Sequence, residues 1–266
     1  MTGTIRVELG EGVATVTISH AARFNAMSRV MWRELRAVFE QLHVRSEVRC
    51  VVVRGEGAHF CAGGDISEYT SFRFEEASLR DFHENDVWGA LAAMLACDVP
   101  MVAHIEGNCM GAGVEIASCC DIRLASSNAR FGAPIAKLGF PMAPREAALV
   151  AREVGLMTAR QMLLEAALFN ATEMQARGFI SRVFDPVALD ADVVATAQRI
   201  VRLAPLAARA NKQVMRALNN PLDSVDDPGK SLNLTSVQLD SPYAYAFSEE
   251  HREGIHAFIN KRTPRF

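Results

Sequence analysis

The chain has 266 residues, of which 50% are hydrophobic and 22% charged, and its formal net charge is −3. This composition is typical of a globular protein, and the length fits one large domain or a domain with an appendage. Lys and Arg are scattered, with no basic stripe interleaved with aromatic residues, so composition gives no sign of nucleic-acid binding. The N-terminus lacks a signal-peptide pattern, and the longest apolar run (87–97) is too short to span a bilayer, so we expect a cytoplasmic protein.

In the first half of the chain, strand patterns alternate with helix patterns. Short β-branched stretches predict strands, and apolar residues at helical spacing predict helices. A glycine-containing loop (59–65) follows the second strand, and Pro100 ends the second helix. The expected strands are 12–19, 49–57, 101–106 and 121–126, and the expected helices are 28–43, 75–97 and 111–119.

The second half is expected to be mostly helical. Two capping-box patterns, Thr158 with Gln161 and Thr172 with Gln175, predict helix starts, and Gly178 fits a helix stop. Further helices are expected at 190–219 and 249–261, and a linker at 219–233, which is rich in Pro, Asp, Asn and Ser. The order of elements predicts an α/β core over residues 1–200, followed by a helical C-terminal region over 201–266.

Glu115 is the only charged residue between Glu106 and Asp121. Burial of an isolated carboxylate is costly, so such a group shifts its pKa, finds a partner or serves a function. A half-exposed or locally hydrogen-bonded glutamate would also explain it. However, the glycines at 107, 111 and 113 follow a strand and open a helix, which places backbone N–H groups near Glu115. With the second glycine loop, "CAGGD" (61–65), they could form an oxyanion hole made of backbone N–H groups.

Other chemistries find no support in the sequence. "GAGVEI" has Ile116 where a dinucleotide-binding motif needs its third glycine, and neither a P-loop nor a Gly-x-Ser-x-Gly nucleophile motif is present. His104, within a predicted strand, is interpreted as a core histidine. The six cysteines match no metal-binding spacing, so we expect buried, reduced thiols and no metal site.

Four stretches together resemble the crotonase, or enoyl-CoA hydratase/isomerase, family. They occur in the family's order and span nearly the whole chain. They are "RFNAMS" (23–28), "VVVRGEGAHFCAGGDISEY" (51–69), "PMVAHIEGNCMGAGVEIASCCDIRLASSNARFGAP" (100–134) and "SEEHREGIHAFINKRTPRF" (248–266).

The resemblance implies an α/β fold, a crotonase-like spiral of ββα units with a helical C-terminal trimerisation region, assembled as a homotrimer or a hexamer. It implies an acyl-CoA substrate, with coenzyme A as part of the substrate and no separate cofactor. The thioester carbonyl would bind the N–H groups of Ala62 and Ala112, with Glu115 as the base. Arg23 and Lys261 are candidates for the CoA phosphates, and Phe258 for the adenine. The substrate-binding residues carried over are Arg23, Phe24, Ala26, Ala62, Gly63, Gly64, Asp65, Ile66, Gly111, Ala112, Pro134, Ile135, Phe258 and Lys261.

The chain also departs from the family pattern. Hydratases have a second glutamate after the proline of Phe-Gly-x-Pro, whereas this chain has Ile135 after Pro134. Glu146 follows in the same stretch, but the sequence does not place it in the pocket. Asp65 is also interpreted as a structural carboxylate that starts the next helix.

These features favour an enoyl-CoA hydratase that uses Glu115. An enoyl-CoA isomerase, a decarboxylase or thioester hydrolase on the same scaffold, and a catalytically degenerate acyl-CoA binding protein remain alternatives.

Overall fold

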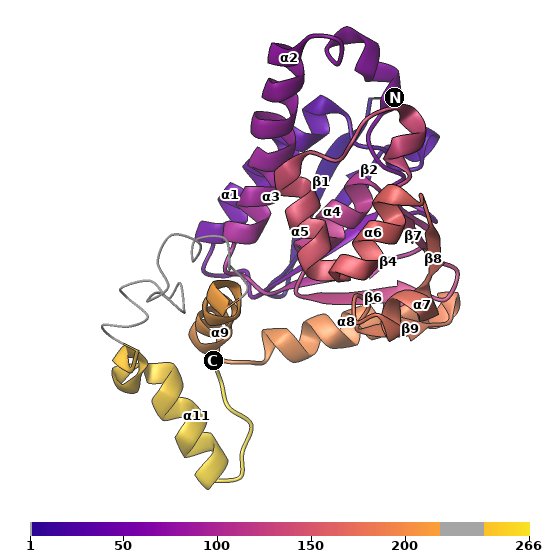
Figure 1. The fold of residues 1–266 in the computed structure, drawn as a ribbon. Coiled ribbons are helices and arrows are strands. Elements are labelled where there is room, and N and C mark those ends of the chain that lie inside the picture. Colours follow the sequence, from indigo (N-terminus) through magenta and orange to yellow (C-terminus); the bar gives the residue numbers. More distant parts are fainter. Residues whose placement is uncertain (1, 219–241) are drawn as a thin grey trace, which may run out of the picture.

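A computed structural model describes residues 2–218 and 242–266 (Figure 1). Strands and helices alternate along the first half, and helices dominate the second. The strands are β1 (Thr4–Gly10), β2 (Val13–Ser19), β3 (Cys50–Gly55), β4 (Met101–Ile105), β5 (Asn108–Met110), β6 (Ile122–Ser126), β7 (Arg130–Gly132), β8 (Leu168–Asn170) and β9 (Arg182–Phe184). The α-helices are α1 (Arg29–Val44), α2 (Glu76–Asp81), α3 (Trp88–Ala96), α4 (Ala112–Ser118), α5 (Pro144–Val154), α6 (Leu156–Leu164), α7 (Ala171–Ala176), α8 (Pro186–Val201), α9 (Pro205–Leu218) and α11 (Glu249–Ile259). Shorter helical turns are η1 (Ala21–Arg23), η2 (Ile66–Ser71), η3 (Phe82–Val87), η4 (Ile135–Leu138) and η6 (Ala244–Phe247).

The main sheet has six strands in the order β1-β2-β3-β4-β6-β9. β1 is antiparallel to β2, and every other neighbouring pair is parallel. The run Val51–Val53 of β3 is buried, as expected for a parallel strand covered on both faces. A second sheet has three strands in the order β5-β7-β8. Along the chain, β5 follows β4 and β7 follows β6, each after a short turn. The α/β class expected from the sequence is confirmed.

Two apolar clusters fix the sheet between helices. On one face, α1 packs on α3, and its buried residues Trp32, Leu35 and Phe39 belong to the main core. On the other face, α8 packs against β3, β4 and β6 through Leu189 and Val193. Figure 1 shows α8 running along the side of the sheet opposite α1 and α3. The large core therefore lies on the side that also carries α4 and α5.

Most predicted elements in the first half are confirmed. The predicted strands correspond to β2, β3, β4 and β6, and the predicted helix 28–43 to α1, which Ser28 caps by accepting a hydrogen bond from the Met31 N–H. The expected helix 75–97 contains a π-helical segment, η3, between α2 and α3. The sequence analysis missed β1, in which five of seven residues are exposed, and the three-residue strands.

Predictions in the second half need correction. Thr158 is the third residue of α6 rather than its N-cap. The capping box of α7 is formed by Asn170 and Glu173, two residues before the predicted Thr172 pair. Gly178, with φ of 82°, follows the last turn of α7 and confirms the helix stop.

The C-terminal region contains two helices where one was predicted at 190–219. α8 ends at Val201 and α9 begins at Pro205, since proline is favoured at a helix start and breaks a helix interior. Helix 249–261 corresponds to α11, and the predicted linker 219–233 lies outside the described residues. The division of the chain at residue 200 stays a prediction.

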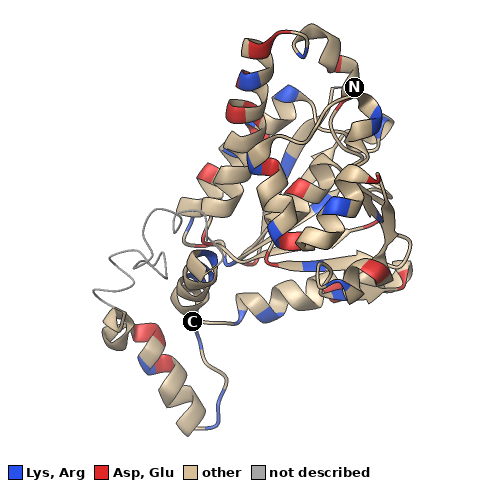
Figure 2. Ribbon diagram, in the orientation of Figure 1, with Lys and Arg blue, Asp and Glu red and all other residues tan. Residues whose placement is uncertain are grey.

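The distribution of charged residues, cysteines and His104 agrees with a folded α/β domain. Figure 2 shows Lys and Arg interspersed with Asp and Glu along the helices. In the described part of the chain, no helix is long and apolar enough to cross a membrane. All six cysteines are buried and free, as expected, and burial raises the pKa of Cys61 to about 12. His104 is half-buried on β4, its Nε2 3.6 Å from Asp190 Oδ1, and burial lowers its pKa.

Candidate active site

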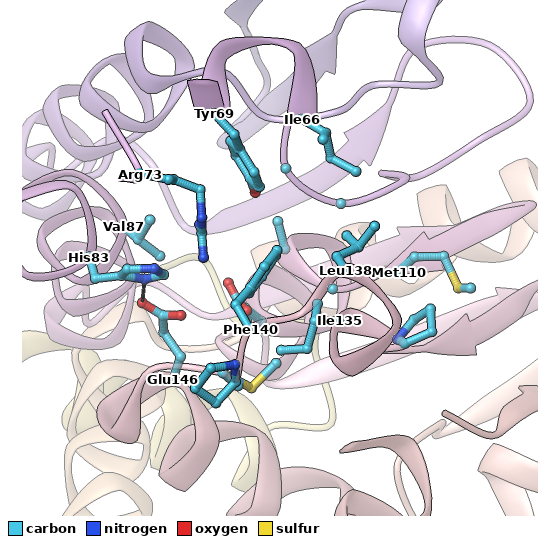
Figure 3. A pocket seen from close by; sticks show the side chains of 18 of the residues that line it. Ile66, Tyr69, Arg73, His83, Val87, Met110, Ile135, Leu138, Phe140 and Glu146 are labelled. Carbon is cyan, nitrogen blue, oxygen red and sulfur yellow. Dashed lines mark hydrogen bonds and ion pairs between the residues drawn. The ribbon is translucent and has the colours of Figure 1, made fainter. Parts of the chain in front are cut away.

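A cavity of about 350 Å³ lies between the loop 62–66, the start of α4, η4 and the start of α5 (Figure 3). Its walls are mainly apolar, and its polar side chains are few. The apolar lining includes Trp32, Ile66, Phe82, Val87, Met110, Ile135, Leu138, Phe140 and Met142. The polar or charged lining consists of Tyr69, Arg73, His83, Glu115, Lys137 and Glu146. Such a cavity, with a small number of polar groups on an apolar wall, is typical of a small-molecule site.

Glu115 lies in the first turn of α4 and is only 6% exposed. Burial raises the pKa of its carboxyl well above the usual range, and the negative charge of Glu146 raises it further. The preceding Gly111 has φ of 48°, a conformation that favours glycine, and lets the chain turn from β5 directly into α4. Ala112 is the first residue of α4, so its N–H has no acceptor within the helix.

The loop 62–64 lines the same cavity, but the Ala62 N–H is not free. It donates a hydrogen bond of 3.0 Å to the carbonyl oxygen of Phe24. Binding of the thioester carbonyl by the N–H groups of Ala62 and Ala112 therefore stays a prediction, and in this structure the Ala62 N–H already has an acceptor. Ala62 can bind a substrate oxygen only by sharing its proton with Phe24 or by releasing that carbonyl.

Glu146 brings a second carboxylate into the cavity. It lies in the first turn of α5, is 3% exposed, and its Oε1 is 2.9 Å from Nδ1 of His83 in η3 (Figure 3). The sequence analysis did not place Glu146 there. A signal was available, because Glu146 falls with Leu149, Val150 and Val154 on the buried face of α5.

Arg73 and Tyr69 also line the cavity and were not predicted. The Arg73 guanidinium lies 4.4 Å from the Tyr69 ring centroid and 3.8 Å from that of Phe140. The Tyr69 ring is itself 5.9 Å from Phe140. Burial raises the pKa of Tyr69 to about 12, so its hydroxyl stays protonated at neutral pH. An aromatic pair therefore holds a cation at the wall of the cavity.

Comparison with known proteins identifies the family of this chain. Residues 8–266 match the family model described as enoyl-CoA hydratase/isomerase. The chain belongs to the enoyl-CoA hydratase/isomerase family. It is 32% identical to a short-chain-enoyl-CoA hydratase of Clostridium acetobutylicum, over 94% of this chain and 92% of the relative. It is 30% identical to a crotonyl-CoA hydratase of Syntrophomonas wolfei, over 98% of this chain and 97% of the relative. A crystal structure of an enoyl-CoA hydratase/carnithine racemase from Magnetospirillum magneticum has a TM-score of 0.90 at 34% identity and covers 100% of this chain and 96% of that chain.

The structure brings together most of the residues carried over from the enoyl-CoA hydratase/isomerase family. The cavity lining contains Ala62, Gly63, Gly64, Ile66, Gly111, Ala112, Glu115, Pro134 and Ile135. Ile135 starts η4 beside the cavity, so an apolar side chain stands at the position that the resemblance assigns to a second glutamate.

The remaining carried-over residues lie outside this cavity. Asp65 caps η2, accepting hydrogen bonds from Ser67, and is 3.4 Å from Arg23, which supports its structural interpretation. Phe24 is exposed, and Ala26 is buried next to it. Phe258 is 84% exposed on α11, and Lys261 follows that helix. Their predicted roles toward CoA stay predictions.

Gly113 sets the distance between α4 and the loop before Ala62. A Cβ on Gly113 would lie 2.6 Å from the Cys61 carbonyl oxygen, so Gly113→Ala must move the start of α4. A displacement of a reacting group by about 1 Å can lower the rate a hundredfold. Because Gly113→Ala should displace the start of α4 by less than this, we expect it to lower kcat roughly tenfold. Steady-state kinetics on an enoyl-CoA measures it. In the control Gly89→Ala, the new methyl meets the flexible end of Arg36 at 3.2 Å, and we expect unchanged kcat.

Proposed function

We propose that the protein adds water to a 2-enoyl-CoA thioester and forms the 3-hydroxyacyl-CoA. One observation carries this proposal: two buried carboxylates, Glu115 and Glu146, line one apolar cavity at the N-terminal end of α4. Hydration needs one group that takes a proton from water and one that gives a proton to carbon. Coenzyme A enters as part of the substrate, and the proposed steps use no other cofactor.

The thioester carbonyl would be polarised by backbone N–H groups. We place its oxygen against the Ala112 N–H, at the positive end of α4, with a second N–H from the loop 62–64. Polarisation makes C3 electrophilic and stabilises the enolate that forms when water adds there. Each such donor contributes about 3 kcal/mol to stabilisation of the oxyanion.

In the proposed reaction the two carboxylates together hold one proton. The ionised carboxylate takes a proton from water as the hydroxyl oxygen bonds to C3. The protonated carboxylate gives its proton to C2 as the enolate returns to the thioester, so one water is consumed and the pair exchanges its proton. Like charges in one apolar cavity favour this singly protonated state.

The resting location of the shared proton refines the role expected for Glu115. Burial and the charge of Glu146 both raise the pKa of Glu115, while Glu146 keeps a hydrogen bond to His83. The raised pKa favours a protonated Glu115 in the resting pair. Glu115 would then protonate C2, and Glu146 would activate the water. Glu146 would thus supply the second carboxylate, which is absent at position 135.

The direct test follows the ultraviolet absorbance of the conjugated enoyl thioester in crotonyl-CoA, with a 3-enoyl-CoA in parallel. We expect the absorbance of crotonyl-CoA to fall with enzyme, accompanied by 3-hydroxybutyryl-CoA. A gain of absorbance with the 3-enoyl substrate alone would instead identify an isomerase. Tight binding of both substrates without turnover would identify an acyl-CoA binding protein.

We also propose that the protein assembles as a homotrimer or a dimer of trimers through its C-terminal region. The apolar side chains Phe247, Phe258 and Ile259, in η6 and α11, are 82%, 84% and 68% exposed in the single chain. Exposed apolar patches of this kind mark interaction surfaces. Light scattering coupled to size-exclusion chromatography measures the assembly, and a monomer at micromolar concentration would contradict it.

A further inference from the structure

Arg73 is a charged group of the cavity that the proposed hydration leaves unused. It is half-buried, and its guanidinium carbon lies over the rings of both Tyr69 and Phe140. Among the residues that the structure describes, it forms neither an ion pair nor a side-chain hydrogen bond. A guanidinium carries five N–H donors and stays charged in proteins. Contact with the two rings therefore restrains the guanidinium, and its N–H donors have no protein partner among the described residues.

The two carboxylates of the cavity do not account for this cation. Glu146 contacts His83, and Glu115 lies in the first turn of α4; neither is within ion-pair distance of Arg73. Figure 3 shows Arg73 on the side of the cavity that also carries His83, Val87 and Glu146, with Ile66 and Met110 on the other side. The loop 62–66 and the start of α4 hold the proposed thioester site. A ligand group at Arg73 would thus be attached to the acyl chain.

We propose that Arg73 binds a carboxylate on the acyl group, so that the preferred substrates are CoA monothioesters of unsaturated dicarboxylic acids. The fork of a guanidinium matches a carboxylate with two parallel hydrogen bonds. Contact with two rings restrains the guanidinium and lowers the entropy cost of holding that fork in place. A simple alkyl chain would leave the same N–H groups without an acceptor, which costs affinity. This inference rests on the proposed function for the thioester chemistry, but its test does not need turnover.

Binding of saturated CoA esters, measured by titration calorimetry, separates the two proposals. The probes are succinyl-, glutaryl- and adipyl-CoA, their methyl-ended counterparts butyryl-, valeryl- and hexanoyl-CoA, and free CoA. We expect at least one dicarboxylic ester to bind about 10- to 100-fold more tightly than its counterpart, as a charge-assisted hydrogen-bonded pair allows. Saturated esters have no double bond to hydrate, so this preference persists even if crotonyl-CoA is never turned over.

Variants assign the preference to Arg73. We expect Arg73→Met to remove it while binding of free CoA and the methyl-ended esters is kept, and Arg73→Lys to retain part of it. Arg145→Met is the matched control, because Arg145 lies beside Glu146 in sequence but pairs with Glu84 at 3.1 Å outside the cavity lining. Equal binding of both ester series by the wild type would overturn the proposal. So would an Arg73→Met variant that weakens all ligands alike, since Arg73 would then bind the CoA portion.

Discussion

Replacing Glu115 by glutamine should lower kcat for hydration about a thousandfold, within the usual range for loss of an acid–base group. Glutamine has nearly the same shape but cannot exchange a proton with the substrate. The apolar cavity wall and the N–H groups of α4 stay in place, so we expect the affinity for a saturated acyl-CoA to change less than threefold. Stopped-flow or steady-state assays with crotonyl-CoA measure the rate, and calorimetry measures the affinity.

The same variant changes the pH dependence of stability in a direction that can be worked out. In the unfolded chain a glutamate titrates near pH ~4.3, whereas burial raises the pKa of Glu115 in the folded protein. Between these two values the folded state binds more protons than the unfolded state, so stability falls as pH rises, by up to about 1.4 kcal/mol per pH unit. Glu115→Gln removes this loss and should unfold at a higher temperature than wild type at neutral pH.

Two results would contradict the role of Glu115. One is wild-type turnover of crotonyl-CoA by Glu115→Gln, which would place the chemistry elsewhere. The other is loss of acyl-CoA binding together with activity, which would make Glu115 a structural group. Glu165→Gln, at an exposed glutamate that ends α6, is the control and should match wild type in both rate and stability.

Glu146→Gln is expected to lower kcat for hydration by a few hundredfold, because the pair then lacks the group that accepts the proton of water. The prediction is specific to this chain, whose residue after Pro134 is Ile135. If the two carboxylates share one proton, kcat/KM of the wild type follows a bell-shaped pH profile. Glu146→Gln should then lose the bell shape, because the pair can no longer share a proton.

The double variant Glu115→Gln/Glu146→Gln tests whether the two residues act as a unit. Groups that act together are strongly non-additive, so the double variant should be little slower than Glu115→Gln alone. Multiplicative losses would instead indicate independent roles. A Glu146→Gln variant with wild-type kcat and an unchanged pH profile would remove Glu146 from the mechanism and leave Glu115 as the single acid–base residue.

Local sequence patterns predicted the elements that local forces fix. The buried run of β3 and the apolar stripe of α1 are visible in the sequence because strand and helix periodicities are intrinsic to the backbone. Elements of three residues, such as β5 and β7, carry too few residues for a period and were missed. The capping prediction at Thr172 was wrong by two residues, since α7 starts earlier and its capping box joins Asn170 and Glu173.

The sequence by itself determined the α/β class, the family and the presence of a carboxylate at the start of α4, because each rests on local patterns and motifs that can be read without knowing which segments meet in space. The tertiary structure alone decided that Glu146 meets His83, 63 residues away, and that the Ala62 N–H bonds to the Phe24 carbonyl. It also decided that the Arg73 guanidinium lies over the ring of Phe140 at the cavity wall. Such contacts join segments that are brought together only when the helices pack on the sheet, so no local period or spacing encodes them.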